Sequence, residues 1–102
     1  MILVDAECFI AVEHRGDFIR EVKKIVPTVL CENGCTRYEL MLGISGESYH
    51  FIEQWESRRH LDEHLVQPHM QEYFKKTTLW QSAPTRLTLY EIASTESVTM
   101  KV

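Results

Sequence analysis

Residues 52–70 have the sequence IEQWESRRHLDEHLVQPHM. The first part predicts a strand that ends at Trp55-Glu56, and Ser57 is a good N-cap for a short helix over residues 58–66. Pro68 suits the first turn of a further helix, where its missing N–H is tolerated. A large aromatic ring and several histidines are thereby brought together in one stretch, which is typical of a small-molecule pocket.

The rest of the chain supplies the other elements of one small domain. Residues 2–12 alternate between two faces, which predicts a strand. Asp17 is expected to cap a helix that Pro27 kinks and that the left-handed Gly34 ends. Further strands are expected over residues 35–42, 49–56 and 85–92, with Pro84 ending the loop before the last one and residues 93–102 forming a Ser/Thr-rich tail.

The predicted order is β-α-β-β-α-β, which is the ferredoxin-like split arrangement of an α+β fold. It places the helices on one face of an antiparallel sheet. In a chain of 102 residues nothing is left to cover the opposite face except a second copy, so we expect a homodimer that packs sheet to sheet. The alternative is that the mixed face of the first strand, with Asp5 and Glu7, meets water.

We expect one domain that spans residues 1–102, and its composition limits the kinds of partner that it can bind. The formal net charge is −4 and no basic run appears, so nucleic acid is an unsuitable partner. No apolar run is long enough to span a membrane, and the alternating start predicts a strand rather than a signal peptide. The three cysteines are an odd number, which fits reduced thiols and a cytoplasmic protein.

Two runs of residues are similar to the antibiotic biosynthesis monooxygenase family, and most of all to its bacterial quinol monooxygenase branch. The resemblance covers roughly residues 1–92 and depends on the order of several motifs along the chain. The runs are Lys24 to Leu30 with Glu32, Gly34-Cys35 and Tyr38, and Ile52 to Ser57 with Leu61, His64-Leu65 and Pro68-His69-Met70.

The resemblance implies a dimeric α+β barrel with a pocket between the sheet and the helices of each subunit. It also implies a monooxygenase that oxidises a quinol-like or polyaromatic small molecule with dioxygen and uses no cofactor, neither metal nor flavin. Other members of the family isomerise small signalling sugars, degrade haem or have no established substrate. An isomerase and a non-catalytic small-molecule-binding or stress protein therefore stay open as alternatives.

Three residues are the candidate catalytic groups. His64 is the first choice for the proton acceptor, because an ordinary histidine pKa of about 6.5 allows proton exchange near neutrality. Trp55 is expected to form an aromatic wall of the pocket. His69, at a helix N-terminus, would stay neutral and donate a hydrogen bond. Each of the three has a plain structural interpretation as well, as a core tryptophan or a structural histidine.

Four aromatic residues are candidates for binding the substrate, although such residues are also common in plain cores: Tyr38, Phe51, Tyr73 and Phe74. Glu39 and Glu53 lie inside strands, and either one would be a base with a raised pKa if it were buried. His60 lies one turn before His64, which is also a spacing for metal ligands, and His69, Asp62 and Glu63 are near enough to add a third. Without an HExxH-type pattern we expect no metal site.

The sequence departs from two branches of the family. The anthrone-oxidising branch has an asparagine and a tyrosine flanking the tryptophan, where this chain has Phe51 and Leu61. The haem-degrading branch has an asparagine in the first strand, where this chain has Glu7. Both departures argue against the reactions of those branches.

Overall fold

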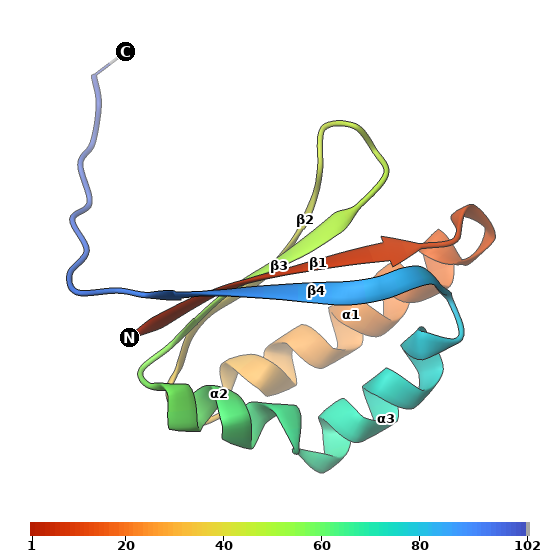
Figure 1. Ribbon diagram of the computed structural model, residues 1–102, viewed down its shortest axis with the longest axis horizontal. Coiled ribbons are helices and arrows are strands. Elements are labelled where there is room, and N and C mark those ends of the chain that lie inside the picture. Colours follow the sequence, from red (N-terminus) through yellow and green to blue (C-terminus); the bar gives the residue numbers. More distant parts are fainter. Residues whose placement is uncertain (102) are drawn as a thin grey trace.

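The alternating faces of the strands build one four-stranded antiparallel sheet, with all helices on one side of it (Figure 1). The computed structural model describes residues 1–101. The strands lie in the order β2-β3-β1-β4. The elements are β1 (Ile2–Ile10), the 3-10 turn η1 (Val12–His14), α1 (Arg15–Leu30), β2 (Cys35–Leu42), β3 (Tyr49–Trp55), α2 (Arg58–Leu65), α3 (Pro68–Thr78) and β4 (Gln81–Glu91).

This is the predicted α+β ferredoxin-like fold, with its second helix divided into α2 and α3. Ser57 caps α2 as expected, since its hydroxyl accepts a hydrogen bond from the backbone N–H of His60. Pro68 stands in the first turn of α3 as expected. The tail from Ala93 onward has no regular structure and leads away from the sheet (Figure 1), and Val102 lies outside the described residues.

The core lies between the helices and the inner face of the sheet. Every second residue of β1 is buried there, from Ile2 to Ile10, because the side chains of a strand alternate between its faces. The predicted apolar face of β1 is thus confirmed, although the strand ends at Ile10 and Val12 is exposed. The opposite face of the sheet carries no helix (Figure 1).

The predicted boundaries of α1 were wrong at its start. The helix begins at Arg15 and its N-cap is His14, whose side chain makes no capping hydrogen bond. A 3-10 turn feeds directly into the helix, so Asp17 lies inside the first turn and pairs with Arg20 instead of capping. At the other end the helix continues through Pro27 to Leu30, because proline removes one backbone hydrogen bond without preventing the next turn.

The prediction that Pro84 ends a loop was also wrong, because Pro84 lies inside β4. β4 is an edge strand that pairs only with β1, and an edge strand tolerates a residue without a backbone N–H. The register shifts at this point, with Arg86 opposite Glu7 but Ala83 opposite Phe9. Two residues, Pro84 and Thr85, thus stand against one residue of β1, which is a β-bulge.

The turn between α1 and β2 packs closely against the start of α2. Gly34 has a positive φ of 77°, and its carbonyl accepts a hydrogen bond of 2.8 Å from the backbone N–H of Glu56. A side chain on Gly34 would collide with the ring of His60 in α2, coming within 2.8 Å of its Cβ atom. Close backbone approach and a left-handed conformation both demand glycine here.

None of the helices within residues 1–101 is long and apolar enough to cross a membrane.

We predict that Gly34→Ala lowers the free energy of unfolding by about 2–4 kcal/mol, since it combines left-handed backbone strain with a clash against His60. The matched control is Gly46→Ala, at the same φ of 77° but with no atom within 4 Å of the added carbon. It should cost only about 1 kcal/mol. Urea denaturation of both variants checks this, and equal losses would show that the contact with His60 is unimportant.

Candidate functional site

A cavity of about 250 Å³ lies between the inner face of the sheet and helices α2 and α3. Its middle is lined mainly by apolar and aromatic side chains, and polar side chains gather at its two ends. The lining consists of Ala6, Cys8, Phe18, Tyr38, Phe51, Glu53, His64, Leu65, Met70, Tyr73, Phe74, Thr78, Gln81, Thr85 and Leu87.

The strand register shows that the two polar ends are far apart. Glu53 is paired with Val4 of β1, whereas Thr85 lies at the bulge opposite Cys8. Four residues of β1 separate these positions, or roughly 13 Å at the usual strand rise. At the far end Thr85 donates a hydrogen bond of 3.2 Å to the side-chain carbonyl of Gln81. The cavity thus suits a molecule with an apolar body and polar groups at opposite ends.

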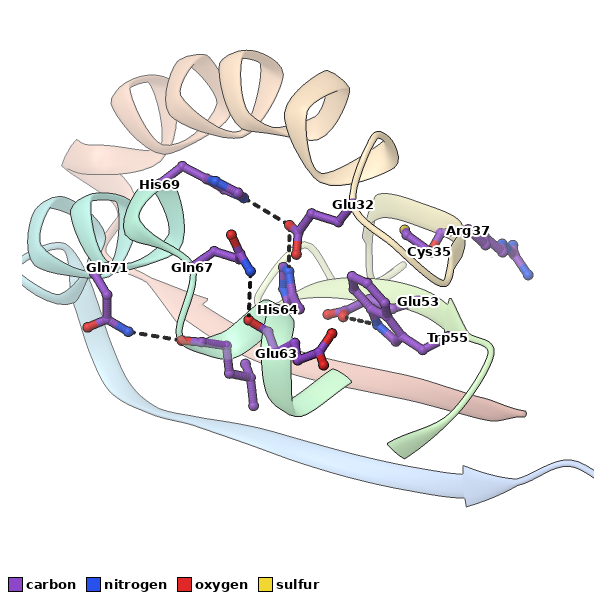
Figure 2. Close-up of polar contacts among 11 residues, drawn as sticks. Glu32, Cys35, Arg37, Glu53, Trp55, Glu63, His64, Gln67, His69 and Gln71 are labelled. Atoms are coloured by element: carbon purple, nitrogen blue, oxygen red, sulfur yellow. Dashed lines mark hydrogen bonds and ion pairs between the residues drawn. The ribbon is translucent and has the colours of Figure 1, made fainter. Parts of the chain in front are cut away.

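His64 is fixed at one end of the cavity by Glu32, from the turn after α1 (Figure 2). The Glu32 Oε2 atom lies 2.9 Å from Nδ1 of His64 and 2.9 Å from Nε2 of His69. A carboxylate only accepts hydrogen bonds, so both rings donate to the same oxygen. His64 therefore carries its proton on Nδ1. Its Nε2 atom, which makes no hydrogen bond within residues 1–101, is left as an acceptor.

The environment keeps the His64 ring neutral. Burial lowers the pKa of His64 below its ordinary value, and this effect outweighs the hydrogen bond and the charge of Glu32, which act in the opposite direction. A neutral imidazole with a free Nε2 is the form that takes up a proton. His64 is thus in the correct state and tautomer to act as a base toward the cavity that it lines.

Trp55 supports this end of the cavity from behind. Its ring lies 4.6 Å from that of His64 and its N–H donates a hydrogen bond of 2.9 Å to Glu53 (Figure 2). The side chain is fully buried and is not part of the cavity lining, so the structure differs from the expected aromatic wall. Trp55 instead positions the two titratable groups that do line the cavity.

Glu53 is the buried carboxyl group of the site. Burial raises its pKa to about 7, although the hydrogen bond from Trp55 opposes the shift. Of the two strand carboxylates that the sequence offered as a base, Glu53 is the buried one, whereas Glu39 is exposed and pairs with Arg37. A carboxyl group with such a pKa exchanges protons at neutral pH, as a general acid does.

The structure brings together most of the residues that the sequence singled out. Tyr38, Phe51, Tyr73 and Phe74 all line the cavity. Burial raises the pKa of Tyr38 well above that of an ordinary phenol, so its hydroxyl stays protonated. His69 does not line the cavity and contacts it only through Glu32 and His64.

Sequence reasoning missed the role of Glu32. It stands within a run that resembles the family, but nothing in the local pattern distinguishes a glutamate after a helix from a solvated one. His60 does not share a site with His64, because its Nδ1 atom lies 2.7 Å from the hydroxyl of Ser57. No group of three metal-ligating side chains occurs in the part of the chain that the structure describes. Glu7 faces the outer side of the sheet near His50.

With this geometry established, comparison with known proteins is informative. A model of the antibiotic biosynthesis monooxygenase family matches residues 1–76. The chain belongs to the antibiotic biosynthesis monooxygenase family. The Escherichia coli K12 protein named "Probable quinol monooxygenase YgiN" is 45% identical over 69 residues, which cover 59% of this chain and 66%, just under two thirds, of that relative.

Solved structures agree on the fold of the family member. Rv0793 from Mycobacterium tuberculosis superposes with a TM-score of 0.87 at 23% identity, covering 94% of this chain and 98% of that one. A conserved protein from Methanosarcina mazei Go1 gives a TM-score of 0.84 at 24% identity, covering 87% of this chain and 89% of that one. At these identities the likeness concerns the fold.

We predict that stability depends on pH through Glu53. Its carboxyl binds a proton more tightly in the folded state than in the unfolded state, so the free energy of unfolding falls as pH rises from about 4.5 to about 7. Glu53→Gln keeps a carbonyl acceptor for Trp55 but cannot ionise. It should be more stable than the wild-type protein at pH 8, by about 3 kcal/mol at most.

Urea denaturation of both proteins between pH 4.5 and 8 measures this difference. Glu39→Gln is the control, because Glu39 is an exposed carboxylate of the neighbouring strand. A difference between Glu53→Gln and wild type that stays constant with pH would contradict the prediction.

Proposed function

We propose that this family member is a monooxygenase that oxidises a quinol-like or polyaromatic small molecule with dioxygen, without metal or flavin. The observation that carries the proposal is the free Nε2 atom of neutral His64 at one end of an apolar cavity. The 45% identity to a relative named as a quinol monooxygenase points to the same class of substrate.

For this oxidation the protein must supply a base and a cavity that fits the substrate and excludes water. Nε2 of His64 takes a proton from a ring hydroxyl, and the resulting quinolate is electron-rich enough to reduce dioxygen directly. Oxygen then adds to a ring carbon, and cleavage of the O–O bond releases water. For a quinol with a free ring C–H, the sum is quinol plus O₂ giving hydroxyquinone plus water. The substrate supplies all four electrons, so the reaction needs no other reductant.

Glu53 is suited to the second proton transfer. Loss of water from the ring hydroperoxide requires a proton at the leaving oxygen, and a carboxyl with a pKa of about 7 is protonated in part of the molecules at neutral pH. Glu53 lines the same end of the cavity as His64, and Trp55 holds both side chains in place. An acid and a base therefore face the same substrate ring.

The size of the cavity favours a compact substrate. Its volume of about 250 Å³ lies just below the usual range of small-molecule pockets, roughly 300–1,000 Å³. We therefore favour a quinol of one or two fused rings over larger polyaromatic molecules. Gln81 and Thr85 would bind the oxygen atom at the end of the ring system opposite His64.

An isomerase acting on a small carbonyl compound is the second candidate, because His64 and Glu53 also form an acid–base pair that could move a proton within one molecule. The two candidates differ in their need for dioxygen, since an isomerase turns over under nitrogen. The third alternative, a binding protein with a filled pocket, is disfavoured by the open cavity in front of His64.

We also propose that residues 1–102 form one domain and that two copies pack through the helix-free face of the sheet. This face carries half-buried apolar side chains beside polar ones, with Leu3 and Phe9 in β1 and Ile52 in β3. A second sheet would cover them without using the cavity side. Light scattering at defined concentrations tests the dimer. Three free cysteines are compatible with the cytoplasm that we assign to the protein.

We predict that His64→Ala lowers kcat for oxygen uptake with a naphthoquinol by about 10²–10⁴-fold, since the general base is lost. His14→Gln is the matched control, because His14 packs on Trp80 and does not line the cavity. An oxygen electrode and mass spectrometry of the product in ¹⁸O₂ measure the reaction. Absence of oxygen uptake by the wild-type protein across one-ring and two-ring quinols would rule out the proposed function.

We further predict that Gln81→Leu raises KM for a 1,4-quinol by about tenfold and changes kcat much less, because a hydrogen bond far from the base is lost. The corresponding phenol with one hydroxyl should show little change in KM. Steady-state kinetics with both substrates decides the point, and an equal rise in KM for both would place the substrate elsewhere.

A further inference from the structure

The Glu32 carboxylate separates two hollows of different character. On one side is the apolar cavity that His64 lines. On the other side is a polar surface hollow of about 330 Å³, lined by Glu32, His60, Glu63, Gln67 and His69 among others. Glu32 does not line the cavity and His64 does not line the surface hollow. The pair of side chains is therefore the wall between the two.

Exposure rises step by step across this wall. The side chain of His64 is 2% exposed, that of Glu32 is 10% exposed and that of His69 is 29% exposed. Both rings donate to the same Oε2 atom at 2.9 Å (Figure 2). A single negative charge is thus shared between a buried histidine that faces the cavity and an outer histidine that meets solvent.

We propose that Glu32 is the positioning residue of His64, and that His69 acts as a solvent-facing sensor that sets how much of the Glu32 charge supports His64. The proposal rests on the function proposed above for its kinetic consequences, but its structural part concerns the three side chains alone. It assigns to His69 a role that acts through Glu32 instead of direct contact with the substrate.

The physical reason is competition for one carboxylate oxygen. When His64 takes a proton on Nε2 it becomes an imidazolium ion, and the adjacent Glu32 charge stabilises that ion. Once His69 is protonated as well, its own positive charge opposes the charge on His64 and draws on the same carboxylate. His64 then becomes a weaker base. A fall in pH in the solvent-facing hollow would in this way lower the basicity of His64 in the cavity.

The charges of the other ionisable groups around His69 cancel one another. Glu21 pairs with Lys24 at 3.4 Å and with Lys76 at 3.6 Å, and Glu72 adds one more negative charge. These four groups carry two charges of each sign. Their charges therefore cancel beside His69, which is the histidine of this side that shares the Glu32 oxygen.

Two further sets of titratable groups face Glu32 and His64. On the surface side these are Cys31, His60 and Glu63, where His60 is held by Ser57 and Glu63 pairs with Arg59. On the inner side they are Cys35, Tyr38 and Glu53. Burial raises the pKa of all three, so the thiol and the phenol stay neutral near pH 7 and only Glu53 changes charge there.

The test uses four variants of the full chain: Glu32→Gln, Glu32→Asp, His69→Gln and the control Glu63→Gln. Glutamine at position 69 can still donate to Glu32 but never gains a charge. Glu63 lines the same surface hollow, and its side chain pairs with Arg59 and makes no hydrogen bond or ion pair with His64 or His69 in the described residues. Nitrogen-15 NMR of the histidine rings gives the tautomer and titration midpoint of His64 without any substrate.

The expected shifts have opposite signs. Glu32→Gln removes the stabilisation of the His64 imidazolium, so the midpoint of His64 moves to lower pH, whereas Glu32→Asp keeps the charge and moves it less. His69→Gln removes the opposing charge, so the midpoint moves to higher pH, by about half a unit. The acid limb of the pH profile of kcat should move in the same directions. Glu32→Gln should also lower the maximal kcat by about 10- to 100-fold.

The proposal would be overturned if His64 had the same titration midpoint in the wild type, Glu32→Gln and His69→Gln. It would also be overturned if Glu63→Gln moved this midpoint as far as His69→Gln does. Should Glu32→Gln fail to fold, His69→Gln and Glu32→Asp still decide it. The outcome is separate from the proposed function. Coupled titration of His64 and His69 without oxygen uptake by the wild type would leave this proposal standing and remove the monooxygenase reaction.

Discussion

The two hydrogen bonds that the largely buried Glu32 carboxylate accepts are the constraint on which the site depends. One oxygen atom joins the turn after α1 to His64 of α2 and His69 of α3. Burial of a lone carboxylate is costly, and two donors offset much of that cost. Glu32 reaches this position because the turn that carries it packs closely against α2. The close approach of Gly34 to His60 fixes the distance between the turn and this helix. The same two hydrogen bonds therefore hold the turn after α1 against α2 and α3 and fix the tautomer of His64.

Burial acts on the two titratable groups of the cavity in a useful way. It raises the pKa of Glu53 and lowers that of His64, because it disfavours the charged form of each. In the molecules in which Glu53 is protonated, an acid and a neutral base thus face the same cavity without a buried ion pair. Trp55 contacts both groups, since its ring packs against that of His64 and its N–H donates a hydrogen bond to Glu53. This is why a tryptophan that never touches the cavity is part of the site.

Local patterns predicted the elements well and the site only in part. The alternation in β1, the cap at Ser57 and the proline at the start of α3 are properties of neighbouring residues, so the sequence reveals them. Glu32 could not be found this way, because its partners are 32 and 37 positions distant. Pro84 misled because proline usually breaks a strand, whereas the edge position and the bulge of β4 accommodate it.

The proposed reaction needs both protons and the exclusion of water, and the two hollows would serve these two needs separately. Oxidation through a reactive quinolate benefits from an enclosed apolar space, because water would stabilise the anion and protonate its intermediates. Control of the base by pH needs the opposite, namely contact with solvent. The apolar cavity on the His64 side and the polar hollow on the Glu32 side would meet these two needs of the proposed function.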